Sequence, residues 1–391
     1  MIRFEASKVV CIVDRRLTSA VEEELRRMGV GGYFAEHAKQ DSVRMRRGLF
    51  GQRTVLSEAP SDIIRFHLPR GRETEAMVRV AAAADLFLPG RGSLFAQPVT
   101  LFLPGKPPKE KLSLELPAWA SRVPLKTSPH DLIWCVVQRG RASELAFSLL
   151  DMGLCVPTVS YGEGMGLRDR LGLLRITIPR DKEILMAIVP PADSDFVMDV
   201  MVRKARLREP GRGYLCRSRV HALVTNTQMY RDPRRHVASM EQVISTLDML
   251  RGSTDWRRLP YAGGRPVQGG HARRLARLSL ICEEGAGEKP IAVALNAGAG
   301  GATKSLMLRQ MTGAEPDAEG AGGEGEGGEW IARGATASHA RERCDLVVPR
   351  DLAQDLETKL EESGFFAAPS MGIAEVSQVI DAVSGVSGNG K

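Results

Sequence analysis

The sequence predicts an α+β fold in which one unit, built as strand, helix, strand, strand, helix, strand, occurs three times in tandem. The first observation is that two prolines lie twenty residues apart in three places: Pro69 and Pro89, Pro190 and Pro210, Pro349 and Pro369. A fixed offset that recurs three times indicates an internal repeat. The second observation is that a cysteine-centred apolar segment opens each unit, at Cys11, Cys135 and Cys282. Three units also agree with a chain of 391 residues.

The first half of each unit is predicted as a strand followed by a helix. β-Branched and aliphatic residues predict strands over residues 9–13, 132–137 and 278–282. The helix of the first two units is expected to end at Gly29 and Gly153, because glycine adopts the left-handed conformation that closes a helix. In the third unit, either Gly300 at the same offset or Gly298 with a two-residue deletion fits this role.

The second half is predicted as strand, helix, glycine turn and strand. Apolar strands precede the first proline of each pair, at residues 63–68, 184–189 and 344–348. Amphipathic helical spacing follows each of them: Met77, Val80 and Ala84; Phe196, Val200 and Val202; Leu352, Leu356 and Leu360. The turn at the second proline then reads Pro-Gly-Arg-Gly twice and Pro-Ser-Met-Gly once.

This order of elements is the ferredoxin-like plan, in which both helices cover one face of a four-stranded antiparallel sheet. The other face of each sheet stays bare, so we expect the three bare faces to pack together as a pseudo-trimer within a monomeric chain. The predicted domains span residues 1–105, 126–255 and 272–391. An extra amphipathic helix is expected over residues 237–250 of the middle domain.

Charge is distributed unevenly between the loops that join the second and third strands. The first unit's long loop carries Arg44, Arg46, Arg47 and Arg53, whereas residues 313–329 of the third form an acidic Gly/Glu-rich insertion. That insertion is predicted to be disordered, because it cannot bury enough apolar surface. Two interpretations remain open: asymmetric contacts with a partner, or charge that is merely solvated.

Composition predicts a soluble cytoplasmic protein. No apolar segment approaches the roughly 20 residues that a membrane helix requires, and no secretory signal is evident. The six cysteines form no C-x-x-C pair, and those within strands are expected to be small buried hydrophobic residues. A net charge of +7 suits a nucleic-acid partner, but the aromatic content of 5% gives no support for sequence-specific recognition.

Glycine segments supply the candidate ligand site. The turns contain Gly90, Arg91 and Gly92, and Gly211, Arg212 and Gly213. Such turns present backbone N–H groups in a concave nest and add a guanidinium, which suits a polyphosphate. Further candidates are the glycines at the base of the middle unit's loop and two arginines on its last strand: Gly162, Gly164, Gly166, Arg217 and Arg219. The alternative is that these glycines only make tight turns.

With these motifs the chain resembles the nitrogen-regulatory P-II proteins and their wider P-II-like superfamily, most clearly from Leu132 to Val220. The resemblance implies ferredoxin-like units that bind an adenine nucleotide (ATP, ADP or AMP) in the clefts between them. It also implies a flexible loop that acts on a transporter or a metabolic enzyme. On the resemblance, Gly211 to Gly213 form the family's glycine turn, and Arg217 and Arg219 face the phosphates.

The chain departs from the family in several places. Members usually carry Lys after the glycine turn, where this chain has Ser93, Tyr214 and Ile373. The third turn lacks the arginine, so we expect at most two equipped clefts. The segment 167–180 is shorter than the family's tyrosine-bearing loop, which gives no support for uridylylation.

Three function classes follow. The leading expectation is a signal-transducing regulator rather than an enzyme, with a transporter or metabolic enzyme for nitrogen or inorganic carbon as its partner. The second is a scaffold protein with degenerate clefts. The third, a nucleotide-hydrolysing enzyme, depends on residues 298–305, which are one residue from a Walker A motif but lie between a predicted helix and strand. The histidines show no catalytic or metal-binding spacing.

Overall fold

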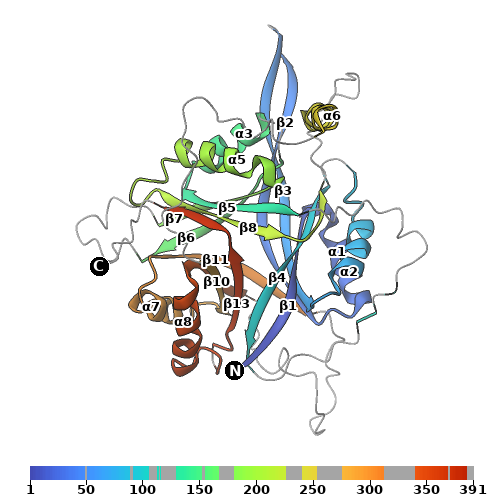
Figure 1. Ribbon diagram of the computed structural model, residues 1–391. Helices are drawn as coiled ribbons and strands as arrows, with labels where there is room; N and C mark the ends of the chain where they lie inside the picture. The colour runs from blue at the N-terminus through green and yellow to red at the C-terminus, as the bar shows by residue number, and fades with distance from the viewer. Residues whose placement is uncertain are drawn as a thin grey trace.

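The computed structural model describes residues 1–48, 51–88, 91–104, 112–113, 115, 129–151, 155–166, 180–225, 240–252, 275–311, 340–368 and 370–384. One antiparallel sheet of 14 strands joins all three parts of the chain, and helices surround it (Figure 1). The predicted mixture of helices with a large antiparallel sheet is therefore confirmed. The acidic segment 313–329, Gly153 and most of the segment 167–180 lie outside the described residues.

Three groups of four neighbouring strands share one spatial order, in which the group's second, third, first and fourth strands follow each other across the sheet. Group 1 contains β1 (Ile2–Asp14), the 3-10 helix η1 (Arg15–Leu17), α1 (Thr18–Met28), β2 (Gly32–Gly48), β3 (Gly51–Pro69), α2 (Glu73–Ala83) and β4 (Gly92–Leu103). Group 2 contains β5 (His130–Gln138), α3 (Ala142–Asp151), β6 (Thr158–Met165), β7 (Asp181–Val189), α5 (Pro191–Lys204) and β8 (Gly213–Val220). Group 3 contains β10 (Leu275–Glu283), α7 (Glu288–Asn296), β11 (Ala302–Met311), β12 (Ala340–Pro349), α8 (Arg350–Glu362) and β13 (Ile373–Val379). Outside the groups lie β9 (Ala222–Thr225), β14 (Asp381–Ser384) and the extra helix α6 (Met240–Arg251), which falls within the range predicted for it except at its last residue.

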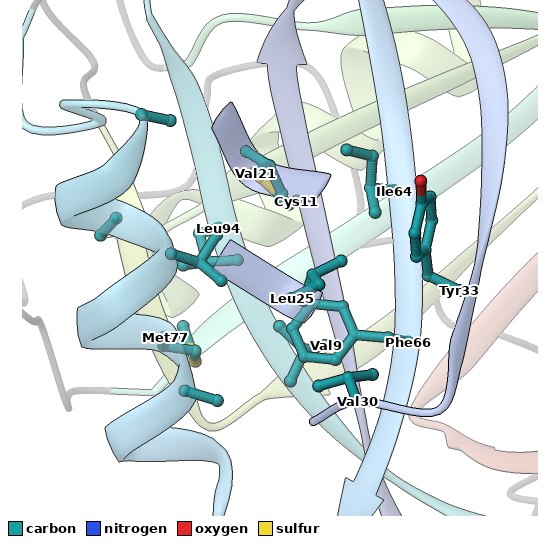
Figure 2. Packing of buried hydrophobic residues seen from close by; sticks show 14 of the residues in the cluster. Val9, Cys11, Val21, Leu25, Val30, Tyr33, Ile64, Phe66, Met77 and Leu94 are labelled. Carbon is teal, nitrogen blue, oxygen red and sulfur yellow. The ribbon is translucent and has the colours of Figure 1, made fainter. Parts of the chain in front are cut away.

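Each group has a hydrophobic core between its helices and one face of its strands. Figure 2 shows this core in group 1, where Leu25 of α1 and Met77 of α2 lie near Val9 and Phe66 of the sheet. Fully burying a side chain of this size contributes roughly 1.5–3 kcal/mol. Equivalent clusters lie in groups 2 and 3, and a fourth cluster joins the opposite strand faces of all three groups. The six cysteines are all buried, which confirms the expectation for those within strands.

The long loop expected in group 1 is instead a β-hairpin. The register of β2 and β3 continues from Phe34 opposite Arg65 to Gly48 opposite Gly51. Figure 1 shows this hairpin extending beyond the body of the molecule. The four arginines of the expected loop therefore belong to an extended pair of strands.

Strand register corrects the alignment of the third unit. In groups 1 and 2, Val13 and Val137 face Gly92 and Gly213. In group 3, Ile281 faces Ile373, so the next pair places Cys282 opposite Gly372, at the position of these valines. Leu280 is therefore the counterpart of Cys11 and Cys135, and the aligned cysteine of the third unit was two residues out of register.

The two alternatives for the helix-closing glycine are resolved by the same shift. Gly298 lies eighteen residues after Leu280, as Gly29 lies eighteen after Cys11. Its φ is 108°, and its N–H donates to Leu295 O at 3.1 Å, just past the end of α7. Gly29 has a φ of 74° after α1, as predicted.

Strand pairs join the groups in a cyclic order. The start of each group's second strand pairs with a later part of another group's second strand: β2 with the end of β11, β6 with the middle of β2, and β11 with the end of β6. A second set of pairs involves the end of a fourth strand or the short strand that follows it: β9, which follows β8, pairs with β4, β14, which follows β13, pairs with β8, and the end of β4 pairs with β13. Each of the two kinds of strand pair therefore occurs three times: once between groups 1 and 2, once between groups 2 and 3, and once between groups 3 and 1.

Candidate functional site

The glycine turn of group 2 joins α5 to β8 at the end of the sheet. The helix closes through Arg206, which has a φ of 54°, and through Leu207 N–H, which donates to Val202 O at 3.0 Å. Gly211 follows with a φ of 76°, and its carbonyl accepts a hydrogen bond from Gln138 Nε2 at 3.3 Å. The turn is therefore attached to the last residue of β5.

Gly213 and Gly92 allow the fourth strand to approach the first. A Cβ atom on Gly213 would lie 1.8 Å from Val136 O, and one on Gly92 would lie 2.0 Å from Ile12 O. Their φ values of 130° and 142° also disfavour residues that carry a side chain. A strand-packing requirement therefore explains these two glycines without a ligand, and Gly90 lies outside the described residues.

The two turn arginines differ in their environment. Arg212 is about one-third exposed, at 32%, and its Nε donates to Glu209 Oε2 at 3.1 Å. Arg91 accepts a hydrogen bond through its carbonyl from Asp14 N at 3.0 Å. The bond from Arg16 chiefly holds the pKa of Asp14 below its usual value, and the charge of Arg91 adds to this effect. Both arginines are thus partly exposed, and each has a carboxylate nearby, Glu209 for Arg212 and Asp14 for Arg91.

The third turn is built differently. Met371 has a φ of 39°, and a Cβ on Gly372 would lie 2.4 Å from the ring of Phe365. Phe365 therefore occupies the space beside the turn, and no arginine is present between Ser370 and Gly372.

Gly162, Gly164 and Gly166 lie where β6 meets β11 of group 3. A Cβ on Gly162 would be 2.6 Å from Lys304 O, and one on Gly166 would be 2.8 Å from Leu295 Cδ2. A Cβ on Gly164 would meet the flexible Lys182 side chain at the same 2.6 Å. These glycines and the 211–213 turn lie at the same end of the group 2 sheet, but β7 and β5 separate their strands.

Arg217 is surrounded by carboxylates instead of pointing to an open turn. It contacts Asp381 through Nη2 at 2.5 Å, Asp195 through Nη1 at 2.8 Å, and Asp131 at 3.7 Å. Burial opposes its charge, but these carboxylates raise the pKa of Arg217 overall. Arg219 Nε lies 3.2 Å from Asp131 Oδ1. Both arginines are therefore already neutralised.

The segment that resembles Walker A has the wrong structural context. It runs from the end of α7 into β11, whereas a phosphate-binding loop of that type leads from a strand into a helix. Lys304 lies within β11, and its Nζ donates to Glu342 Oε1 at 3.1 Å. This segment therefore gives no support to the nucleotide-hydrolysing class. Among the described residues, no group of three His, Cys, Asp or Glu is arranged to hold a metal ion.

An ionic cluster that we did not predict lies in the interior, on strands of two groups. Its members are buried except His67, which is partly exposed, and they come from groups 1 and 3: Lys8, Glu36, Arg65, His67, Arg277, Arg343, Asp345 and Glu375. Lys8 and His67 both contact Glu375, at 2.9 and 2.8 Å. Burial and the neighbouring arginines lower the pKa of Lys8 to about 8, although Glu375 opposes this effect. The signal was present in the sequence, because these charges alternate with core residues along strands whose two faces are both buried.

No protein-family model matches the chain, and no curated protein matches it. Two solved structures show a limited likeness. GlnK of B. subtilis is 12% identical, with a TM-score of 0.22, over 28% of this chain and 99% of that one. Aspartate kinase of Synechocystis is 10% identical, with a TM-score of 0.18, over 96% of this chain and 45% of that one. At these scores neither likeness supports an inference about function. Within the described residues, no helix combines the length and the apolar character needed to cross a membrane.

Proposed function

We propose that this chain is a P-II-like signal-transducing regulator: a single-chain pseudo-trimer that binds an adenine nucleotide or a similar anion at the seams between its three units. The cyclic strand pairing is the observation that carries the proposal. A ring of three subunits requires each contact to recur three times, and both sets of inter-group pairs do so.

The positions of the glycine turns suit a ligand that contacts two units at once. Ser93, just after the first turn, pairs with Thr225, which follows group 2. Tyr214, just after the second turn, pairs with Ser384, which follows group 3. An anion at either turn would therefore lie beside segments from two groups, and Arg91 or Arg212 would supply its positive partner.

Binding at a seam gives a physical route to regulation. A ligand changes the population of two conformations only if it binds one of them more tightly. Ordering a seam would favour one arrangement of the hairpin β2–β3, which extends from group 1 and carries Arg44, Arg46, Arg47 and Arg53 in the part of its sequence nearest the turn. We propose that this hairpin contacts a transporter or a metabolic enzyme.

A scaffold protein with degenerate clefts is the second candidate. The carboxylates around Arg217 and the bond from Arg212 to Glu209 favour it, because arginines that are already paired have less to gain from a phosphate. The absence of an arginine from the third turn points the same way.

Calorimetric titration of the full chain with ATP, ADP and AMP separates these candidates. We expect binding at no more than two sites per chain. Arg212→Ala and Arg91→Ala should each weaken one site about tenfold, the effect of losing one charge-assisted hydrogen bond. Arg27→Ala, which changes an exposed arginine of α1, is the matched control. No detectable binding of any of the three nucleotides would favour the scaffold. Hydrolysis of a nucleotide that Lys304→Ala abolishes would favour an enzyme.

A further inference from the structure

Arginine donors in the interior lack the partners that buried groups require. Arg343 is only 2% exposed, and its Nη2 donates to Asp345 Oδ1 at 3.1 Å. Its Nε and Nη1 atoms have no hydrogen-bond partner among the described residues, nor does Arg277 Nη2. Buried polar groups are hydrogen-bonded in most native proteins, and an unsatisfied charged donor is especially costly.

These donors lie around one aromatic ring. The guanidinium carbon of Arg277 lies 3.7 Å from the ring centroid of Trp134, and that of Arg343 lies 5.2 Å from it. The indole Nε1 of Trp134 is buried and also lacks a partner among the described residues. Three side chains from β5, β10 and β12 therefore bring unsatisfied donors to one region between groups 2 and 3.

The nearby acceptors are largely occupied. Asp345 Oδ1 accepts from Arg277 Nε at 3.0 Å, from Ser279 Oγ at 2.5 Å and from Arg343. Only Asp345 Oδ2 remains as an unsatisfied acceptor of this residue. Tyr214 Oη, which interacts with Arg277 and Asp345, is a second acceptor without a partner among the described residues. The four unpartnered donors of Arg343, Arg277 and Trp134 still outnumber these two acceptors.

Charge in the same region is unbalanced. Lys8, Arg65, Arg277 and Arg343 are the cations, and Glu36, Asp345 and Glu375 are the carboxylates. The positive groups also oppose each other, since Arg343 contributes to lowering the pKa of both Lys8 and Arg65, with burial as the larger cause in each case. An additional negative charge would reduce this repulsion.

We propose that the interior between the strand groups holds a small inorganic anion, bound by the guanidinium groups of Arg343 and Arg277 and by the indole N–H of Trp134. This site is separate from the glycine turns and does not depend on nucleotide binding. Its role is to neutralise the excess positive charge that a fused chain has accumulated at its centre. Because Arg343 is nearly inaccessible, the anion enters during folding or when the strand groups separate locally.

Thermal unfolding tests the proposal. The protein is first refolded in a buffer whose anion is a large organic ion. Sodium chloride and sodium phosphate are added at constant ionic strength. At a hundredfold excess over the dissociation constant, one of these salts should raise the unfolding midpoint saturably, by about 3 °C. Arg343→Met should abolish the response, and Arg27→Met should retain it. No saturable response in the natural chain, or a full response in Arg343→Met, would overturn the proposal.

A crystal grown in sodium bromide provides a measurement that does not depend on a variant folding. We expect an anomalous peak within about 3.5 Å of Arg343 Nε or Nη1, the reach of a charge-assisted contact. An ordered interior with only water at that position would overturn the proposal. A peak without any thermal effect in either salt would identify an adventitious ion only and would also overturn the neutralising role.

Discussion

Lys8 and Glu375 form an ion pair in the interior, with Lys8 Nζ 2.9 Å from Glu375 Oε2, although 367 positions separate them in the chain. The pair joins β1 of group 1 to β13 of group 3, and both side chains are almost fully buried. The counterparts of Lys8 by strand register are Leu132 and Arg277. A homotrimer would place the same residue at all three positions, so this pair requires a chain whose units have diverged.

Loss of one partner of this pair should be more harmful than loss of both. Glu375→Leu leaves Lys8 buried without its carboxylate and also removes the partner of His67, so we expect a cost of about 3–5 kcal/mol. The double variant Lys8→Met, Glu375→Leu replaces the pair with apolar groups and should recover much of that loss. Urea unfolding of the single and double variants measures the coupling. Costs that simply add would contradict this prediction.

Burial of Lys8 should also make the free energy of unfolding increase with pH in the alkaline range. The pKa of Lys8 is lowered from 10.5 to about 8, chiefly by burial. Between these values the unfolded chain binds more protons than the folded chain, so the free energy of unfolding contributed by Lys8 increases with pH. Lys8→Met should remove this rise, whereas Lys289→Met, an exposed lysine of α7, should keep it. The measurement is urea unfolding at pH 8, 9 and 10. If the free energy of unfolding rose equally with pH in both variants, the prediction would be contradicted.

The sequence predicted the repeated order of elements well, because proline offsets and apolar periodicity are local signals. It placed the end of α1 at Gly29 correctly for the same reason. It misaligned Cys282, since a buried strand offers several apolar positions and only pairing with β13 fixes the register. The short strands β9 and β14 carry no strong signal of their own, and they form where a neighbouring group provides an edge.

The candidate site was harder to predict than the fold. Gly213 and Gly162 were interpreted as ligand-facing, but each has a nearby backbone oxygen that forbids a side chain. A sequence shows that glycine is needed without showing what approaches it. The carboxylates around Arg217 come from β5, α5 and β14, and no local pattern brings these three elements together.

Substitution of Gly213 tests the packing explanation. Gly213→Ala places a Cβ 1.8 Å from Val136 O at a φ of 130°, so the chain must shift, and we expect a loss of at least about 2 kcal/mol. Gly300→Ala is the matched control, because nothing lies within 4 Å of its added Cβ. Urea unfolding of both variants gives the comparison. If Gly213→Ala were as stable as Gly300→Ala, the close strand approach would not be the reason for this glycine.

The contact between Arg217 and Asp381 should hold β14 on β8. Arg217 binds both carboxylate oxygens of Asp381, and the next pairs of the ladder place Ala382 opposite Cys216 and Ser384 opposite Tyr214. Asp381→Asn weakens this contact by removing its charge, while Asp131 and Asp195 still satisfy the arginine. Amide hydrogen exchange across residues 382–384 should therefore become faster, while exchange in β5 stays unchanged.

The same measurement on Asp355→Asn, an exposed carboxylate of α8, controls for a general loss of charge in group 3. The strand β14 closes the seam beside the second glycine turn. If the seam is the ligand site, release of β14 should also lower the affinity for an anion that binds at Arg212. Unchanged exchange over residues 382–384 would show that backbone pairing alone holds β14. Faster exchange with unchanged nucleotide affinity would place the ligand elsewhere and leave the strand contact intact.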